Sequence, residues 1–441
     1  MELTTEHIAI LGKVRLRVIP ILMLCYFAAF LDRVNIGFAA LKMNDDLHLT
    51  ATAFGTGAGL FFLGYVIFEV PSNLILARVG ARVWIARIML TWGIISALTA
   101  FVWDRDSFYA IRVFLGAAEA GFFPGLLFYC TLWFPRAYRA RIYGLTQIAP
   151  PLSSVIGAPL STYILTRMDG ISGLHGWQWM FVIEGMPAVI MGIVVYFALP
   201  SRPQDARFLS PHEKDVLQDL LTRERLAREK EEKFTVLQAM TDGRVLAMCC
   251  IALGLVIGTT GAAIWMPQIV KTFGLDTMQV GLVSAIPPFV AVFATIFSGW
   301  NADRTGARVA HIAVPFLLAA SGFVLTALTS NPVLGLIGLI IGTAGIAAGS
   351  PSVWVLPTAL LTGTASAAGL ALINSAGSTG GFAGPYIIGW VRDTTGSFSF
   401  ALLFLAAVMA AAAGVAILLG ARMGPILSPA RFRTLSAKVS S

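Results

Sequence analysis

The stretch Arg78-Val79-Gly80-Ala81-Arg82 follows an apolar run, and Arg304-Thr305-Gly306-Ala307-Arg308 follows another such run 226 residues later. Each stretch places a glycine between two arginines, where a helix is expected to end and a charged loop to begin. The same offset relates three further pairs of residues: Gly55 and Gly281, Gly116 and Gly342, and Pro159 and Pro385. One offset shared by a charged motif and a proline pair predicts two halves with the same topology.

The composition is that of a membrane protein. Of 441 residues, 57% are hydrophobic and 12% are charged, and the mean hydropathy is +0.79; a soluble domain carries about a quarter of charged residues. Apolar runs of roughly 18 to 25 residues recur, each long enough to cross a hydrocarbon core of about 30 Å. They do not alternate apolar and polar residues, which excludes an outer-membrane barrel. We expect an all-α membrane protein with 12 transmembrane helices, near residues 18–40, 51–76, 84–103, 108–132, 143–166, 177–199, 244–271, 278–301, 311–329, 333–362, 366–389 and 397–420.

The repeat and the runs together divide the chain into five parts. The stretch Ser210-Pro211-His212-Glu213 offers a cap residue, a proline at the first helical position and a glutamate that can complete a capping box, which predicts a linker helix. The expected parts are an N-terminal cytoplasmic segment (1–17), a six-helix bundle (18–200), a cytoplasmic linker (201–243), a second six-helix bundle (244–420) and a cytoplasmic tail (421–441).

The net charge of +8 is unevenly placed. With both termini assigned to the cytoplasm, 24 of the 31 lysines and arginines lie on the cytoplasmic side, five lie outside, and Arg33 and Arg112 lie within apolar spans. This is the positive-inside pattern of an even number of spans. The charge therefore reports topology and not nucleic acid binding, and it predicts a multi-pass protein of the bacterial cytoplasmic membrane with N and C termini inside.

The sequence lacks the motifs of the common enzymes and metal sites. The four cysteines lie in apolar spans without disulfide or metal spacing, and the five histidines are terminal or in loops. No glycine-rich phosphate loop accompanies a strand, and no HExxH motif occurs. We expect no cofactor, no metal ion and no enzymatic activity.

Ionisable residues within the spans are confined to the first half. An ionised side chain at the bilayer centre costs at least about 2.5–3.5 kcal/mol, so each requires a partner, a cavity or a function. The spans of the second half hold no acid and offer hydrogen-bonding residues instead, which predicts that the first half handles charge and protons. The six residues are Asp32, Arg33, Glu69, Arg112, Glu119 and Glu184.

Helical spacing constrains how these residues meet. The side chains of Asp32 and Arg33 point about 100° apart around the helix, so we expect them to contact different partners. Arg112 and Glu119 share a helix face but stand about 10 Å apart along the axis, which disfavours direct pairing. A buried ion-pair lattice that holds two helices together is the alternative reading. We expect Glu69 to pair with loop arginines and Glu184 to cap or pair near a helix start.

Several motifs carry a resemblance to a known family. The loop from Gly299 to Arg308 resembles the signature of the major facilitator superfamily, and its counterpart after the second helix has Ala77 where the signature has Asp. Phe30-Leu-Asp32-Arg33-Val-Asn35 and the stretch from Arg112 to Gly125 resemble the anion:cation symporter branch. The resemblance implies two pseudo-symmetric six-helix bundles that carry carboxylates, such as tartrate, sugar acids or aromatic acids, together with protons.

The buried charges and the resemblance together assign roles to individual residues. We expect Asp32 and Glu119 to carry protons, Arg112 to be the main anion anchor and Arg33 to be a second cation. The resemblance implies a substrate-contacting tyrosine at Tyr65. The remaining expected substrate contacts are Gln147, Trp354, Asn374 and Ser378, and the expected gating residues are Arg78, Arg82, Asp303, Arg304 and Arg308.

These expectations define a secondary active transporter. It would import a small organic anion with protons by alternating access, as a monomer surrounded by membrane lipid. Two alternatives remain open: an anion exchanger or uniporter of the same fold, and a membrane solute sensor that binds without transporting.

Overall fold

The computed structural model describes residues 4–135, 138–139, 142, 146, 148–228, 242–360 and 364–422, and every regular element in these ranges is helical. Ten of its segments are long and apolar enough to cross a membrane: Thr5–Asp46, Ala51–Val79, Ala81–Phe101, Arg105–Thr131, Gly176–Ala198, Gly243–Lys271, Thr277–Thr305, Ala310–Leu328, Pro332–Pro357 and Phe398–Arg422. Helices α7 (Ala149–Arg167) and α16 (Thr364–Thr395) occupy the two remaining positions, which is consistent with twelve spans.

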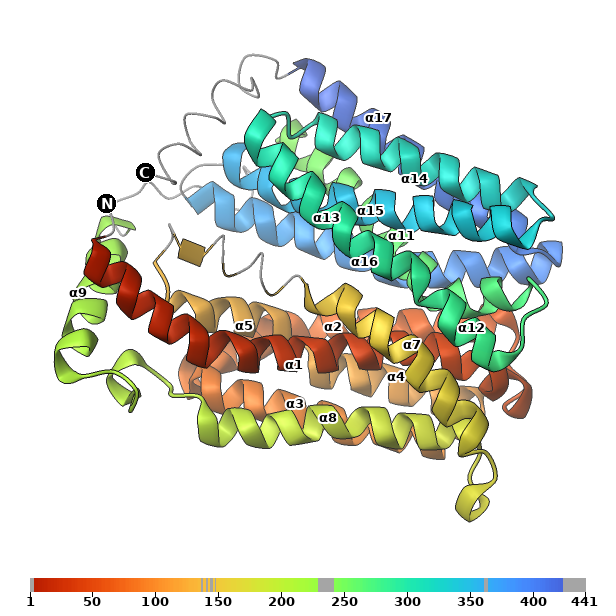
Figure 1. Ribbon diagram of the computed structural model, residues 1–441, viewed down its shortest axis with the longest axis horizontal. Coiled ribbons are helices and arrows are strands. Elements are labelled where there is room, and N and C mark those ends of the chain that lie inside the picture. The colour runs from red at the N-terminus through yellow and green to blue at the C-terminus, as the bar shows by residue number, and fades with distance from the viewer. Residues whose placement is uncertain are drawn as a thin grey trace.

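The helices form two layers that correspond to the two halves of the sequence (Figure 1). The first layer contains α1 (Thr5–Asp46), α2 (Ala51–Val79), α3 (Ala81–Leu98), α4 (Arg105–Glu119), α5 (Phe122–Thr131), α7 and α8 (Gly176–Ala198). The second layer contains α11 (Gly243–Lys271), α12 (Thr277–Ser284), α13 (Ile286–Thr305), α14 (Ala310–Leu328), α15 (Pro332–Leu360), α16 and α17 (Phe398–Arg422).

Helix α9 (Pro211–Arg228) marks one end of the molecule, here called the α9 end (Figure 1). The expected capping box is present: the backbone N–H of Ser210 donates to Glu213 Oε2 at 2.8 Å, and the N–H of Glu213 donates to Ser210 Oγ at 3.3 Å. Lys13 of α1 pairs with Glu213 at 2.5 Å, and this hydrogen bond holds the pKa of Glu213 below its ordinary value. Helix α1 runs unbroken from Thr5, so residues 5–17 continue the first span and pack against α9.

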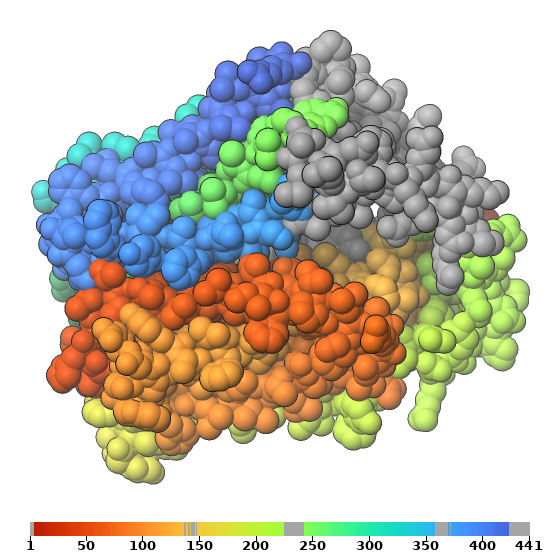
Figure 2. All heavy atoms as spheres, turned by 180° about the vertical axis from the view of Figure 1, so that it is seen from behind, coloured from red at the N-terminus to blue at the C-terminus, as the bar shows by residue number. Residues whose placement is uncertain are grey.

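The other end of the molecule, here called the opposite end, is where the two halves approach most closely. Helix α1 packs against α11, α2 against α16, and α7 against α12 and α13. A Cβ atom at Gly37 would overlap the carbonyl of Ile264, and one at Gly55 would overlap the carbonyl of Pro385. Glycine is therefore required there because the backbones are in contact. The seam between α2 and α16 crosses the surface in Figure 2 as the boundary between red-orange and blue spheres.

The fourth span is broken, although the sequence predicts one helix over 108–132. Helix α4 ends at Glu119, Gly121 adopts a left-handed conformation with φ of 85°, and α5 starts at Phe122. Ser72 Oγ donates to the carbonyl of Ala120 at 2.6 Å, which satisfies one of the carbonyls that the break releases. The break places Glu119 at the end of a helix inside the first half.

Candidate functional site

The centre of the first half contains an ion pair between Arg33 of α1 and Glu119 of α4. The Arg33 guanidinium also lies over the rings of Phe30, Phe61 and Tyr65, at 5.2, 5.6 and 5.7 Å from their centroids. The Glu119 side chain is fully buried, whereas that of Arg33 is 25% exposed. Within the described chain, Glu119 Oε2 has no hydrogen-bond partner. The pair is thus reached from solvent through Arg33.

Arg33 lies on the face of α1 that packs against the second half. Arg33 and Gly37 are four residues apart, so they lie on the same face of α1. Gly37 contacts the backbone of Ile264 on α11, which belongs to the second half. Arg33 is therefore the cation of the first half that a molecule held between the halves would meet.

Asp32 has different partners, as its position on α1 predicts. Its carboxylate accepts hydrogen bonds from Trp92 Nε1 at 2.7 Å, from Ser96 Oγ and from Asn35 Nδ2 at 3.4 Å. Its exposed fraction is 2%. Both carboxylate oxygens therefore have uncharged donors, two of them from α3.

Arg112 is placed differently from the expected main anion anchor. It is 3% exposed, its Nε donates to the carbonyl of Gly57 at 3.4 Å, and its guanidinium lies 5.1 Å from the centroid of Phe61. In the described ranges, no carboxylate forms an ion pair with it, so Arg112 and Glu119 do not pair directly. In this conformation a bound anion would meet Arg33 before Arg112.

In the described part of the chain, a hydrogen bond joins the two halves on the side of the ion pair toward the α9 end. Asn374 Nδ2 of α16 donates to Glu69 Oε1 of α2 at 3.2 Å. The expected pairing of Glu69 with loop arginines is wrong for the part of the chain described, because Glu69 instead reaches across the seam. Trp354 and Ser378 are half-buried on α15 and α16, and Gln147 lies outside the described residues.

Glu184 also differs from its expected place near a helix start. Helix α8 begins at Gly176, so Glu184 lies more than two turns inside the helix. It is 1% exposed and accepts a hydrogen bond from Ser161 Oγ of α7 at 2.7 Å. It therefore belongs to the interior of the first half.

The two repeated loops at the α9 end have similar backbones and different charges. Gly80 ends α2 with φ of 98°, and Gly306 ends α13 with φ of 71°. Arg308 pairs with Asp303, whereas Ala77 occupies the corresponding position of the first loop. The other expected gating residues are Arg82, which lies 5.5 Å from the ring of Tyr196, Arg304, which lies 5.5 Å from the ring of Trp300, and Arg78, which is exposed.

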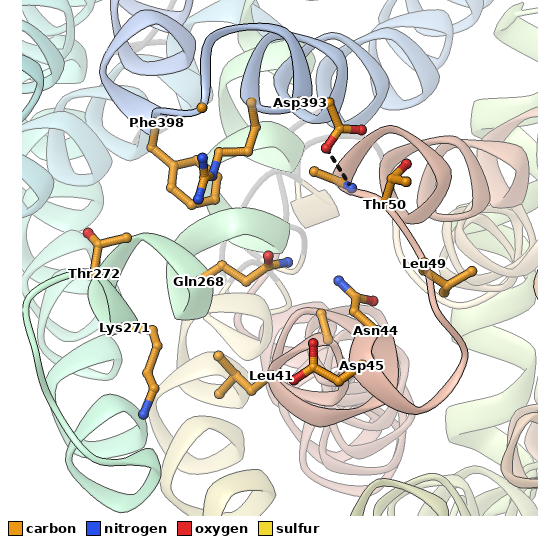
Figure 3. A pocket seen from close by; sticks show the side chains of 14 residues that line it. Leu41, Asn44, Asp45, Leu49, Thr50, Gln268, Lys271, Thr272, Asp393 and Phe398 are labelled. Carbon is orange, nitrogen blue, oxygen red and sulfur yellow. Dashed lines mark hydrogen bonds between the residues drawn. The ribbon is translucent and has the colours of Figure 1, made fainter.

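A polar pocket of about 590 Å³ lies between the halves at the opposite end. Figure 3 shows the Gln268 and Asn44 amides directed toward each other from α11 and α1. Beside them, Asp393 accepts hydrogen bonds from the backbone N–H groups of Ala51 at 3.1 Å and Thr52 at 2.7 Å, at the start of α2. Partial burial opposes the charged carboxylate, but these hydrogen bonds outweigh it and hold the pKa of Asp393 below its ordinary value. We call this contact the Asp393 latch.

No cluster of three or more histidine, cysteine or acidic residues with metal-binding geometry occurs in the described ranges. The cysteines there are free thiols: Cys25, Cys130, Cys249 and Cys250.

Two layers of membrane-length helices with buried charges inside one of them are characteristic of a polytopic membrane carrier. The model of the Major Facilitator Superfamily matches residues 22–385, so the chain belongs to this superfamily. The protein is accordingly a membrane transporter and not an enzyme.

The chain is similar over nearly its full length to several bacterial transport proteins. It is 48% identical to a protein from Agrobacterium vitis named for tartrate transport, over 93% of this chain and 94% of the relative. It is 42% identical to the metabolite transport protein NicT of Pseudomonas putida, over 94% and 95% of the two chains. It is 39% identical to the inner membrane transport protein RhmT of Escherichia coli, over 91% and 92%.

Solved structures share the fold. A bacterial homologue of the human lysosomal transporter Spinster matches with a TM-score of 0.70 at 17% identity, over 96% of this chain and 97% of that chain. The D-xylose-proton symporter matches with a TM-score of 0.70 at 16% identity, over 90% and 96%. At these identities the likeness establishes the arrangement of helices alone.

Proposed function

We propose that the protein imports an organic anion together with protons, and that the Arg33–Glu119 ion pair couples the two. The observation that carries this proposal is a buried carboxylate whose cation is partly exposed and lies on the face of α1 that packs against the second half. While Glu119 is ionised, its carboxylate holds the Arg33 guanidinium in the ion pair. Protonation of Glu119 removes its charge and leaves the guanidinium free for a substrate carboxylate, which its planar fork binds through two hydrogen bonds.

Charge balance makes the binding of proton and anion mutually dependent. A carboxylate that approached Arg33 while Glu119 was ionised would place two anions against one exposed cation. A proton that bound Glu119 without an anion would leave Arg33 unpaired inside the protein, which is costly. Binding both restores the original net charge, so the loaded and empty carriers are the states in which the halves reorient.

The second half supplies an uncharged wall. Asn374, Trp354 and Ser378 offer hydrogen bonds and an aromatic surface, and Tyr65 extends the first-half wall beside Arg33. Gln147 is assigned to the same substrate site from the sequence alone. Asp32 is assigned as a second proton-carrying residue, and Arg112 stabilises the negative charge of Asp32 and Glu119 from within the bundle.

The orientation follows from the distribution of charge. The lysines and arginines concentrate in the linker and loops at the α9 end, so we assign this end to the cytoplasm and the protein to the bacterial inner membrane. The opposite end is then external, and its backbone contacts and the Asp393 latch close the external path. The loops with Arg78, Arg82, Asp303, Arg304 and Arg308 are proposed to hold the cytoplasmic side in the other state.

The names of the relatives support a carboxylate as the cargo, because one is named for tartrate transport. The test is uptake by purified protein in liposomes, with tartrate, sugar acids and aromatic acids screened in turn. We expect accumulation of at least one of these acids when the outside is acidic, and none when an ionophore abolishes the proton gradient. Uptake that does not depend on the proton gradient would establish an exchanger or uniporter, and binding without uptake would establish a sensor. Either result overturns the proposal.

A further inference from the structure

Glu184 is a buried acid to which the proposed coupling assigns no role. Ser161 Oγ donates to its Oε1 at 2.7 Å, and its Oε2 has no hydrogen-bond partner in the part of the chain that is described. No described lysine or arginine forms an ion pair with it. An ionised carboxylate with one neutral donor and no cation is expensive to bury, whereas a protonated carboxyl is not.

Asn35 connects Glu184 to Asp32. Its side-chain amide donates to Asp32 Oδ1 at 3.4 Å and also interacts with the Glu184 carboxyl. Asn35 is 1% exposed, and its Oδ1 has no partner among the described atoms. An amide both donates and accepts, so Asn35 can accept a hydrogen bond from protonated Glu184 while it donates to ionised Asp32. Asn35 therefore lies between the two carboxyl groups, hydrogen-bonded to Asp32 of α1 and next to Glu184 of α8.

In the described helices that pack against α8, no lysine or arginine pairs with Glu184, and Arg33 of α1 pairs with Glu119 instead. Helix α8 packs against α1, α3 and α7, and Gly185 meets the backbone of Ala97, which sets the level of Glu184 on α3. On α3, Arg87 lies about 15 Å away along the helix axis, and on α7, Arg167 lies about 9 Å along the axis from Ser161. The charged residue that faces Glu184 is Asp32, an acid.

The balance of buried charge points the same way. Apart from Glu69 at the seam between the halves, the first half holds three interior acids, Asp32, Glu119 and Glu184, and two arginines, Arg33 and Arg112. With all five ionised the interior would carry one excess negative charge. A single proton shared between Asp32 and Glu184 makes it neutral.

We propose that Glu184 is a third proton-carrying residue, coupled to Asp32 through Asn35, so that one of these two acids is protonated while the other is ionised. The step is a proton transfer from the Glu184 carboxyl to the Asp32 carboxylate: one O–H bond breaks, another forms, and the negative charge moves to Glu184. This inference rests on the proposed proton coupling. It adds Glu184 as the site that holds the proton in the interval between one exposure of Asp32 to solvent and the next.

Infrared spectroscopy of the purified protein tests the protonation directly. We expect a carboxylic C=O band of a buried acid at neutral pH that disappears in alkaline buffer, is absent from Glu184→Gln and is shifted in Asp32→Asn. Should Glu184→Gln fail to fold, Ser161→Ala keeps the carboxyl and removes its one donor, so the band should shift. A pH-difference spectrum of either variant that matches the unaltered protein would overturn the proposal.

Transport measurements then ask whether this proton takes part in coupling. We expect Glu184→Gln to lower proton-driven uptake about tenfold and to flatten its pH profile, while counterflow without net proton movement changes by less than about twofold, within the usual range of coupling between sites. Glu184→Asp, which retains a carboxyl, should recover part of the pH dependence. Ser153→Ala is the matched control, because Ser153 is a buried hydroxyl of α7 without a hydrogen-bond partner in the described structure; both of its rates should stay unchanged.

The two readouts separate the two proposals. If the unaltered protein shows no proton-dependent uptake, the proposed function fails, while the infrared comparison still decides whether Glu184 exchanges a proton with Asp32. If uptake is proton-driven and Glu184→Gln keeps both its rate and its pH profile, the role of Glu184 is overturned and the proposed function stands.

Discussion

On α4 of the first half, Arg112 and Glu119 stand 226 residues before Gly338 and Gly345 on α15 of the second half. In the second half, the neighbouring helix packs directly against these glycines: a Cβ atom at Gly345 would lie 2.5 Å from the carbonyl oxygen of Pro315 on α14. In the first half, the corresponding positions carry the charged side chains of Arg112 and Glu119, and α4 packs mainly against α2 and much less against α3. The repeat therefore fixes the topology while leaving each half free to fill its interior with charge or with backbone contact.

The same contrast extends to the polar cluster around Asp32. At the repeat offset, the residues that hold Asp32 and Glu184 in the first half are replaced by residues without hydrogen-bonding side chains. Asp32 corresponds to Gly258, Asn35 to Gly261, Ser96 to Gly322, Ser161 to Ile387 and Glu184 to Ala410. The two-bundle architecture thus does not require these groups, which is consistent with a functional reason for their presence in one half.

The largest effect is expected from Glu119→Gln, which removes the titrating member of the Arg33–Glu119 ion pair. Glutamine cannot release Arg33 in response to a proton, so we expect proton-driven uptake to fall about 100-fold while counterflow persists, as for a strong coupling between two sites. Uptake of radiolabelled acid into liposomes measures both rates. Glu213→Gln, in α9 and outside the proposed site, is the control and should transport normally; an equal loss in both modes would mean that Glu119 is structural.

Next in size is Gly345→Ala, which tests the close packing of the second half. The methyl group would meet the Pro315 carbonyl and the Ala319 nitrogen at 2.5 and 2.7 Å, and backbone atoms there cannot move aside. Overpacking of this kind costs about 1–3 kcal/mol, so thermal unfolding in detergent should begin several degrees lower. Gly414→Ala on α17 meets no atom within 4 Å and should be neutral or slightly stabilising. Equal melting of the two variants would remove the contrast between the halves.

A smaller effect is expected from Asp393→Ala, which opens the latch between α16 and the start of α2. Loss of a helix-capping carboxylate costs about 0.5–2 kcal/mol, so external opening should become about 2- to 30-fold more populated. Labelling of an introduced Asn44→Cys by a membrane-impermeant thiol reagent reports this opening. Unchanged labelling would show that the latch does not hold the external side closed.

The same latch gives a pH dependence with a definite sign. Closure of the latch lowers the pKa of Asp393. The latch therefore stabilises the closed state fully above the ordinary aspartate pKa, and this stabilisation is lost as pH falls through the lowered pKa. External labelling should therefore be constant near neutral pH and rise below about pH 4. In Asp393→Ala this acid-induced rise should be missing.

The smallest effect is expected from Asn374→Ala, which removes the hydrogen bond between α16 and Glu69. A single partly exposed hydrogen bond contributes about 0.5–1.5 kcal/mol, so apparent affinity for the anion should weaken by no more than about tenfold. The maximal rate should be nearly unchanged, because no titrating group is lost. A collapse of the rate instead would move Glu69 and Asn374 from the wall of the site into its coupling machinery.

The sequence predicts the architecture and the charged residues of the site for identifiable physical reasons. Long apolar runs and an unequal distribution of charge determine spans and topology, and the cost of burying charge singles out Asp32, Arg33 and Glu119. What the sequence leaves open is which partner each charge meets. Trp92 and Ser96 are ordinary residues of an apolar span, so no pattern indicates that they hold Asp32.

The differences between expectation and structure have local causes. The break after Glu119 is encoded by Gly121 and by Pro124 three residues later, but this signal is weak inside an apolar run long enough to be one helix. Arg112 and Arg33 differ in exposure because their rotations about their helices differ, and rotation is set by packing that a single sequence does not contain. Glu69 reaches Asn374 because the two halves meet along α2 and α16, a contact between distant parts of the chain.

The central claim is that a proton and a carboxylate bind together by dividing one ion pair, the proton at Glu119 and the carboxylate at Arg33, and proton uptake on anion binding tests it most directly. Purified protein in weakly buffered solution is mixed with the transported acid while the pH is recorded. We expect net proton uptake when the anion binds to the unaltered protein, and none with Glu119→Gln. Anion binding without proton uptake, or equal uptake by the two proteins, would contradict it.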